Sequence, residues 1–188
     1  MSRCVKHARD SISFSAGRSS QGIYRSSREM YAYTYGNPVS LTDPSGLFAS
    51  PWHFGITVAA ALNAGYSLGG SLAIAWYSVT TDIGTQGIDD ANIHSMAIGG
   101  PNPQSVADAQ AGAQAYVDSQ LSLDTLQGLG NAAHTLEDAC ASGHRFKQWN
   151  GGLPSFKHEL GDWFPSPSAV IGAYSNAYGA LSQHRNNP

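Results

Sequence analysis

Residues 124–141, DTLQGLGNAAHTLEDACA, carry the strongest structural pattern in the chain. Apolar and small side chains recur there at steps of three and four residues: Leu126, Leu129, Ala133, Leu136 and Cys140. This spacing places them on one face of an α-helix. The same stretch holds His134 and Asp138, whose side chains project from one helix face about a turn apart. The sequence therefore predicts a packed helix that presents an imidazole and a carboxylate to one cation.

Further helices are expected on both sides of this segment. Residues 54–81 carry no charged side chain, and this uncharged run is long enough to span a bilayer. Gly and Ser residues near their middle favour two core helices instead. Ser105 is suited to cap the Ala- and Gln-rich helix that follows it. Besides 124–141, the predicted helices are residues 52–64, 68–80, 104–120, 155–162 and 167–182, with loop-like residues 82–103 among them. The predicted fold class is all-α, a multi-helix bundle.

The composition bounds the class of protein. An apolar fraction of 41% with only 12% charged residues argues against a disordered chain. Cys4 and Cys140 lie too far apart in the sequence to indicate a disulfide framework or a thiolate metal site. The N-terminus shows no apolar stretch of the kind that a signal peptide needs, so none is expected.

Charge and motif both divide the chain near residue 47. Residues 1–47 hold six basic and three acidic side chains, whereas residues 48–188 hold four basic and ten acidic ones, a net charge of −6. An acidic domain binds polyanions poorly unless cations are bound to it. Tyr31, Tyr33 and Tyr35 alternate as on a strand, and the turn signals Asn-Pro and Asp-Pro-Ser-Gly follow them.

Residues 31–47, from the Tyr-x-Tyr pair through Asn-Pro to Asp-Pro-Ser-Gly-Leu, resemble the end of the Rhs/YD-repeat core. In that family the segment closes a β-cocoon ahead of a variable toxin. The resemblance implies that residues 1–47 are an irregular and β remnant of the core, and that cleavage after Leu47 releases a toxin of residues 48–188. It further implies delivery into a target cell as a secreted effector, with the Rhs core shell and a cognate immunity protein as partners.

Five histidines and three aspartates in residues 48–188 form the candidate site. His158 and Asp162 repeat the four-residue spacing of the first pair, and His144 lies between the two pairs. Farther upstream, His53 begins an apolar helix, and Asp82 ends the uncharged run, where a buried carboxylate needs a partner. The loop between helices adds His94. Imidazoles combined with carboxylates suit a zinc-like ion.

This order of residues resembles the zinc-dependent phospholipase C family and the related single-strand-specific zinc nucleases. The segment Leu129-Gly130-x-x-x-His134-x-x-x-Asp138 matches their L-G-x-x-x-H-x-x-x-D helix, and His144 and His158 follow at the spacing of the bacterial phospholipases. The upstream spacings are shorter than in the family. Either Asp89 or Asp90 could take the place of Asp82.

The resemblance implies two or three zinc ions. The first would be held by Asp82, His94, His134 and Asp138. The second would be held by His144, His158 and Asp162. The third would take His53, share Asp138, and use the backbone of Phe48 once cleavage after Leu47 makes Phe48 the terminal residue.

The resemblance also implies hydrolysis of phosphodiester bonds. Asp82 would orient or deprotonate the attacking water, and Trp149 and Trp163 would contact the substrate. The acidic balance and the spacing match favour phospholipid headgroups. Asp162 and the Phe48–His53 interval favour the alternative, a nuclease acting on single-stranded nucleic acid. A third alternative, a membrane-inserting module, would rest on residues 54–81.

Overall fold

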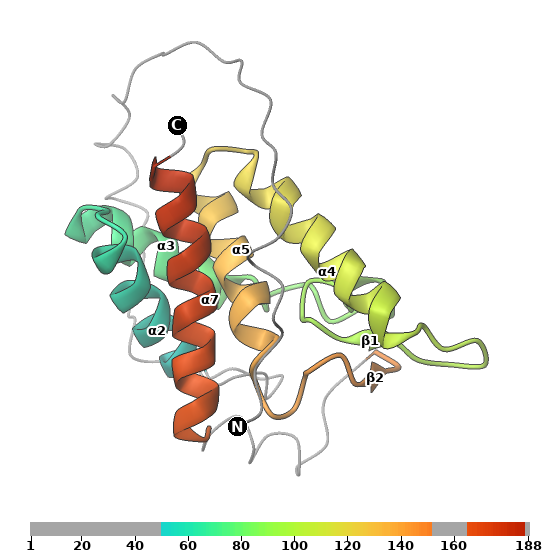
Figure 1. The fold of residues 1–188 in the computed structure, drawn as a ribbon. Coiled ribbons are helices and arrows are strands. Elements are labelled where there is room, and N and C mark those ends of the chain that lie inside the picture. The colour runs from blue at the N-terminus through green and yellow to red at the C-terminus, as the bar shows by residue number, and fades with distance from the viewer. Residues whose placement is uncertain (1–49, 152–164, 187–188) are drawn as a thin grey trace.

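The computed structural model describes residues 50–151 and 165–186, and these residues are mostly helical (Figure 1). The helices are α2 (Ser50–Asn63), α3 (Leu68–Thr80), the 3₁₀ helix η2 (Ile88–Asp90), α4 (Val106–Leu121), α5 (Leu126–Asp138) and α7 (Pro167–Asn186). Two short strands, β1 (Ala97–Ile98) and β2 (Gln148–Trp149), pair in parallel. The predicted helical class is confirmed. The predictions for residues 1–47 and for a helix at 155–162 lie outside the described residues.

Side-chain caps set where several helices begin. Ser67, Ser105 and Thr125 each accept a hydrogen bond from a backbone N–H three residues later, at 3.0–3.1 Å. Such caps satisfy N–H groups that have no partner within the helix. The predicted N-cap at Ser105 is confirmed.

The C-terminal end of α5 falls at Asp138, three residues before the predicted end at residue 141. Tight bonds from Cys140 N to the Glu137 carbonyl at 2.9 Å and from Ala141 N to the Asp138 carbonyl at 3.0 Å close its last turn. Bonds of this i to i+3 kind commonly finish a helix whose last carbonyls lack α-helical partners. The helix therefore ends at Asp138, and the chain continues through a loop to β2.

Helix α5 is the central element of the bundle. It packs against α2, α3, α4 and α7, and in Figure 1 it lies behind α7 and between α3 and α4. Two of its neighbours bury small side chains: α7 buries Ala169, Ala173 and Ala177, and α4 buries Ala109 and Ala113, which pack with Ala97 and Phe146. Alanine at every fourth position forms a flat stripe, which lets helices pack closely.

Gly130 of α5 marks the closest approach to α3. A Cβ added at Gly130 would lie 2.5 Å from the Ile74 carbonyl oxygen and 2.5 Å from Tyr77 Cβ. Packing therefore requires a glycine at this position.

Gly130→Ala is expected to lower the free energy of unfolding by about 1–3 kcal/mol, because the two helices must separate to admit the methyl group. Gly179→Ala is the matched control. A Cβ added at Gly179, in α7, would meet nothing within 4 Å, so alanine there is expected to stabilise the protein by about 0.5–1 kcal/mol. Chemical denaturation measures both. Equal effects of the two substitutions would contradict this account of the α3–α5 contact.

No helix in the described part of the chain is long and apolar enough to cross a membrane. The uncharged run 54–81 instead forms most of α2 and α3, which pack against each other around a turn at Gly65, where φ is +90°. This outcome agrees with the two predicted core helices.

Candidate metal centre

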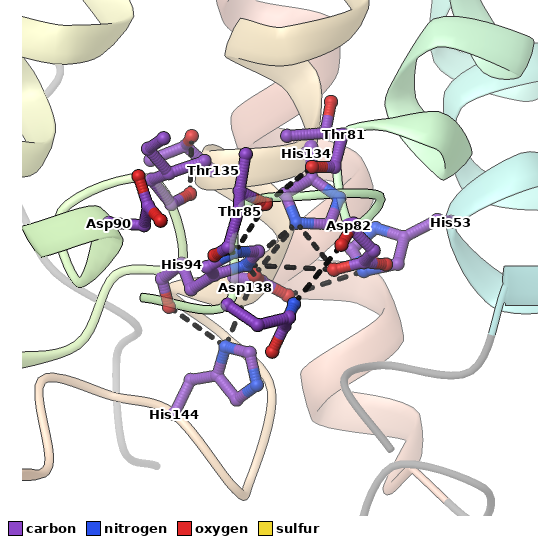
Figure 2. A network of polar contacts seen from close by, with 12 residues as sticks. His53, Thr81, Asp82, Thr85, Asp90, His94, His134, Thr135, Asp138 and His144 are labelled. Carbon is purple, nitrogen blue, oxygen red and sulfur yellow. Dashed lines mark hydrogen bonds and ion pairs between the residues drawn. The ribbon is translucent and has the colours of Figure 1, made fainter. Parts of the chain in front are cut away.

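Six predicted ligands converge at one end of α5 (Figure 2). They come, in chain order, from α2, the turn after α3, the loop before β1, α5 (which provides two of them) and the loop before β2. They are His53, Asp82, His94, His134, Asp138 and His144, here named the histidine–aspartate cluster. All are buried: Asp82 is 7% exposed and the other five are 0% exposed.

Asp138 lies at the centre of the cluster. Its Oδ2 is 3.1 Å from His134 Nε2, 3.2 Å from His144 Nδ1 and 3.3 Å from His94 Nδ1. Its Oδ1 is 3.2 Å from His53 Nε2. One carboxylate thus contacts four imidazoles that come from four separate segments of the chain.

Asp82 faces the same point from the other side. Its Oδ1 is 3.4 Å from His134 Nε2 and 3.6 Å from His94 Nδ1, and neither of its carboxylate oxygens has a hydrogen-bond partner. A buried carboxylate without hydrogen bonds is costly unless a cation compensates its charge. The alternatives Asp89 and Asp90 lie elsewhere: Asp89 is exposed, and Asp90 Oδ2 accepts a hydrogen bond from the backbone N–H of the nearby Gly87.

Backbone carbonyls fix how two of the imidazoles face the cluster. His94 Nε2 lies 2.9 Å from the Thr85 carbonyl, and His144 Nδ1 lies 2.8 Å from the His94 carbonyl. A carbonyl only accepts, so each of these nitrogens carries a proton and donates it. In the neutral ring the other nitrogen then holds a lone pair, which for His94 is Nδ1, facing Asp82 and Asp138. For His94, such anchoring of the opposite ring nitrogen is usual in metal-binding histidines. In His144 the anchored Nδ1 is itself the nitrogen that faces Asp138 Oδ2, at 3.2 Å.

The loops that carry these two histidines are tied together. Phe146 N donates to the Ser95 carbonyl at 2.8 Å, and β1 and β2 pair immediately beyond. Ser95 adopts a left-handed backbone with φ of +48°, and its hydroxyl donates to the Thr135 carbonyl of α5 at 2.7 Å. A non-glycine residue in this region is strained and persists only where its surroundings hold it. The structure therefore holds the His94 loop against α5 despite a local cost.

The buried carboxylates of the histidine–aspartate cluster and its neighbour Glu137 need positive charge to balance them. Asp82, Glu137 and Asp138 are at most 7% exposed. Among the described residues, their ion pairs are with histidines only, and no Lys or Arg reaches them. Buried charges cost several kcal/mol each unless they are paired. Within the described residues, protons on the imidazoles or the carboxyl groups, or bound metal ions, can balance this charge.

In the metal-free state, burial and these same contacts shift the pKa values of His53, Asp138 and Glu137. Burial opposes the charged form of His53, but hydrogen bonds to Asp138 and Glu137 raise the pKa of His53 well above its ordinary value. Burial likewise opposes charge on Asp138, but the positive charges of His144 and His134 hold the pKa of Asp138 well below its ordinary range. Burial raises the pKa of Glu137. Protons thus provide the charge that Asp138 needs, and a metal ion would displace them on binding.

Two overlapping groups of side chains could each hold a metal ion. One comprises His53, His134 and Asp138, and the other comprises Asp82, His94 and His134. Within each group the ligand atoms lie within 4.8 Å of one another. Five of the predicted ligands thus form buried groups that could hold a metal ion, and His144 contacts one of these five, Asp138, at 3.2 Å. The remaining predicted ligands, His158, Asp162 and Phe48, lie outside the described residues.

Of the two predicted substrate contacts, Trp149 borders the cluster. Its half-buried ring meets the His94 ring edge-on, with centroids 5.8 Å apart. Trp163 lies outside the described residues.

Sequence reasoning missed three residues around the cluster: Thr57, Thr85 and Glu137. Glu137 is fully buried and binds both His53 and Thr57. It follows His134 by three residues, so helical spacing already placed it near the predicted ligand face. Thr57 follows His53 by four residues in α2, and the same rule applies. Thr85 contributes a backbone carbonyl, for which the sequence carries no signal.

Comparisons with protein-family models, with curated proteins and with solved structures found no match. The class of protein is therefore defined by the fold and the site: a mostly helical protein with a buried histidine–aspartate centre that could hold metal ions.

Proposed function

We propose that residues 48–188 form a zinc-dependent phosphodiesterase of the phospholipase C type that acts as a toxin on phospholipids. The observation that carries this proposal is a convergence of nitrogen and oxygen atoms of the kind that bind metal ions. His94 Nδ1 and His134 Nε2 are 3.1 Å apart, and each lies within 3.6 Å of Asp82 Oδ1 and within 3.3 Å of Asp138 Oδ2. These two nitrogens and two carboxylate oxygens carry negative charge or lone pairs, so they repel one another unless protons or a cation lie between them.

The separations fit the ion. Zinc binds imidazole nitrogen and carboxylate oxygen at about 2.0–2.2 Å, usually with four ligands in a tetrahedron. The edges of such a tetrahedron are about 3.3–3.6 Å long, given those bond lengths. Five separations among these atoms, from 3.1 to 3.6 Å, overlap this range. Two imidazoles and two carboxylates are also a donor set that zinc accepts, whereas Ca²⁺ and Mg²⁺ prefer oxygen ligands alone.

The bound cations and the surrounding residues would have separate roles in hydrolysis. Bound divalent cations lower the pKa of a coordinated water and neutralise charge on phosphoryl oxygens. Asp82 has two carboxylate oxygens without hydrogen-bond partners, so it can orient a water and accept its proton. Thr85 and its carbonyl hold His94 in place, and Trp149 offers an aromatic edge beside the centre.

The substrate class rests on charge and on the family resemblance. The net charge of −6 over residues 48–188 disfavours a long polyanion, while a single phosphodiester headgroup requires only the cations of the centre. A nuclease that acts on single strands would need basic residues along a groove. Delivery from an Rhs core, protection by an immunity protein and cleavage after Leu47 belong to the same proposal.

One assay separates the two substrate classes. Purified protein loaded with zinc is incubated with phosphatidylcholine liposomes, and in parallel with single-stranded DNA, each with and without chelator. Release of choline phosphate that stops on chelation is the expected result. Digestion of DNA with intact liposomes would instead establish the nuclease alternative. Zinc content, measured on the same samples by mass spectrometry, should be at least one ion per chain; protein that binds no zinc would overturn the proposal whatever the substrate.

A further inference from the structure

A second layer of buried polar contacts lies behind the histidine–aspartate cluster. Glu137 Oε2 accepts a hydrogen bond from His53 Nδ1 at 2.6 Å, and Glu137 Oε1 accepts one from Thr57 Oγ1 at 2.6 Å. All three side chains are 0% exposed. Both carboxylate oxygens of Glu137 are thus engaged, and Glu137 belongs to neither group that could hold a metal ion.

We propose that Glu137 is a positioning residue that acts through His53. An ionised carboxylate only accepts hydrogen bonds, so the proton of this contact resides on His53 Nδ1. His53 Nε2, 3.2 Å from Asp138 Oδ1, is then the nitrogen presented to the cluster. The inference rests on the proposed function, because it assigns Glu137 a role toward the metal that His53, His134 and Asp138 would hold.

Helix geometry explains why Glu137 faces α2 and not the centre of the histidine–aspartate cluster. Consecutive residues on a helix point about 100° apart. Asp138 points at the imidazoles of the cluster, so its neighbour Glu137 points sideways, toward α2. There His53 and Thr57 are four residues apart and share one face of α2, which lets a single carboxylate bridge both.

The His53 ring is held on three sides. Its Nδ1 contacts Glu137, its Nε2 contacts Asp138, and its face stacks on His134 with ring centroids 4.4 Å apart and planes 25° apart. Turning the ring over would place carbon atoms against both carboxylates and leave them buried without those bonds. Losing hydrogen bonds to a buried charge is costly. Glu137 therefore fixes both the ring orientation and the nitrogen that bears the lone pair.

Thr57 in turn fixes Glu137. Its hydroxyl has one proton, and that proton goes to Glu137 Oε1. Without this contact, one oxygen of a fully buried carboxylate would be unsatisfied, and the carboxylate could rotate away from His53. Partners of metal-binding histidines typically change metal affinity by about 10–100-fold when they are removed.

The test is a calorimetric zinc titration of the metal-stripped full-length chain. Glu137→Gln keeps the size of the side chain and is expected to weaken one zinc-binding step by about 10–100-fold. The remaining binding should be unchanged. His53→Ala should lose that same step, and Glu137→Gln added to His53→Ala should change nothing further. Asp89→Asn, an acid-to-amide change at an exposed position, is the matched control and should bind as the wild type does.

A second readout reports on the ring itself. In the zinc-loaded protein, nitrogen chemical shifts of the His53 ring should show a protonated Nδ1 and a ligated Nε2. Thr57→Val, which is nearly isosteric, should weaken the same zinc-binding step by a smaller factor, and it tests the proposal even if Glu137→Gln fails to fold.

Two outcomes would overturn the role of Glu137 while leaving the metal centre intact. One is wild-type zinc affinity in both Glu137→Gln and Thr57→Val. The other is a further loss when Glu137→Gln is combined with His53→Ala, since Glu137 would then act elsewhere. A wild-type chain that binds no zinc refutes the proposed function instead, so the two failures are distinguishable.

Discussion

Asp138→Asn is expected to remove zinc from the centre and to lower phosphodiester hydrolysis by about 10³-fold or more. The carboxylate contacts His53, His94, His134 and His144, at 3.1–3.3 Å. Asparagine removes the negative charge that a bound cation and the surrounding imidazoles require. Metal ions supply several kcal/mol of transition-state stabilisation, and each 1.36 kcal/mol corresponds to about a tenfold change in rate.

Zinc content and choline phosphate release measure this effect together. Asp118→Asn is the matched control, because Asp118 is an exposed acid on α4 whose Oδ1 accepts only from Gln114 within the same helix. The control should keep full zinc content and activity. An Asp138→Asn protein that folds, retains its zinc and hydrolyses substrate at the wild-type rate would show that Asp138 is a structural residue only.

Removal of zinc is expected to lower the melting temperature by about 10 °C. A ligand that binds only the folded state, present at about 1,000 times its Kd, stabilises that state by about 4 kcal/mol. For a chain of this size, each kcal/mol corresponds to about 2–4 °C. The buried carboxylates supply the physical reason: without metal ions, their charge must be balanced by protons taken up on the imidazoles.

Differential scanning calorimetry with and without chelator measures the shift, and added zinc should restore the higher melting temperature. Chelator already saturated with zinc controls for effects of the chelator itself. Asp138→Asn should not respond to chelator, since it has no zinc to lose. A wild-type melting temperature that chelation leaves unchanged would mean that no metal ion contributes to the stability of the fold.

Local pattern was enough to predict the five α-helices of the described residues, but not the 3₁₀ helix η2, which lies in the predicted loop 82–103. The spacing of apolar residues placed α5, and its cap at Thr125 and its tight last turn set the true ends, Leu126 and Asp138. Propensity and periodicity do not define ends that depend on such hydrogen bonds. The predicted helix at 167–182 likewise extends to Asn186 in α7.

The types of ligand could be predicted because imidazole and carboxylate groups bind metal ions in any fold. Their convergence could not, since it depends on how separate segments meet around α5. The bond from His94 to the Thr85 carbonyl and the left-handed backbone of Ser95 arise only in the folded chain. Glu137 had a signal in its position three residues after His134, but only the packing of α2 against α5 shows that it binds His53 and Thr57.

Anomalous diffraction at the zinc absorption edge, from crystals grown with stoichiometric zinc, locates any bound ion without reference to activity. We expect a peak among His94 Nδ1, His134 Nε2 and the carboxylate oxygens of Asp82 and Asp138, at about 2.0–2.2 Å from the atoms that bind it. The absence of a peak at this position, or a peak only at a peripheral histidine such as His184, would refute the metal centre.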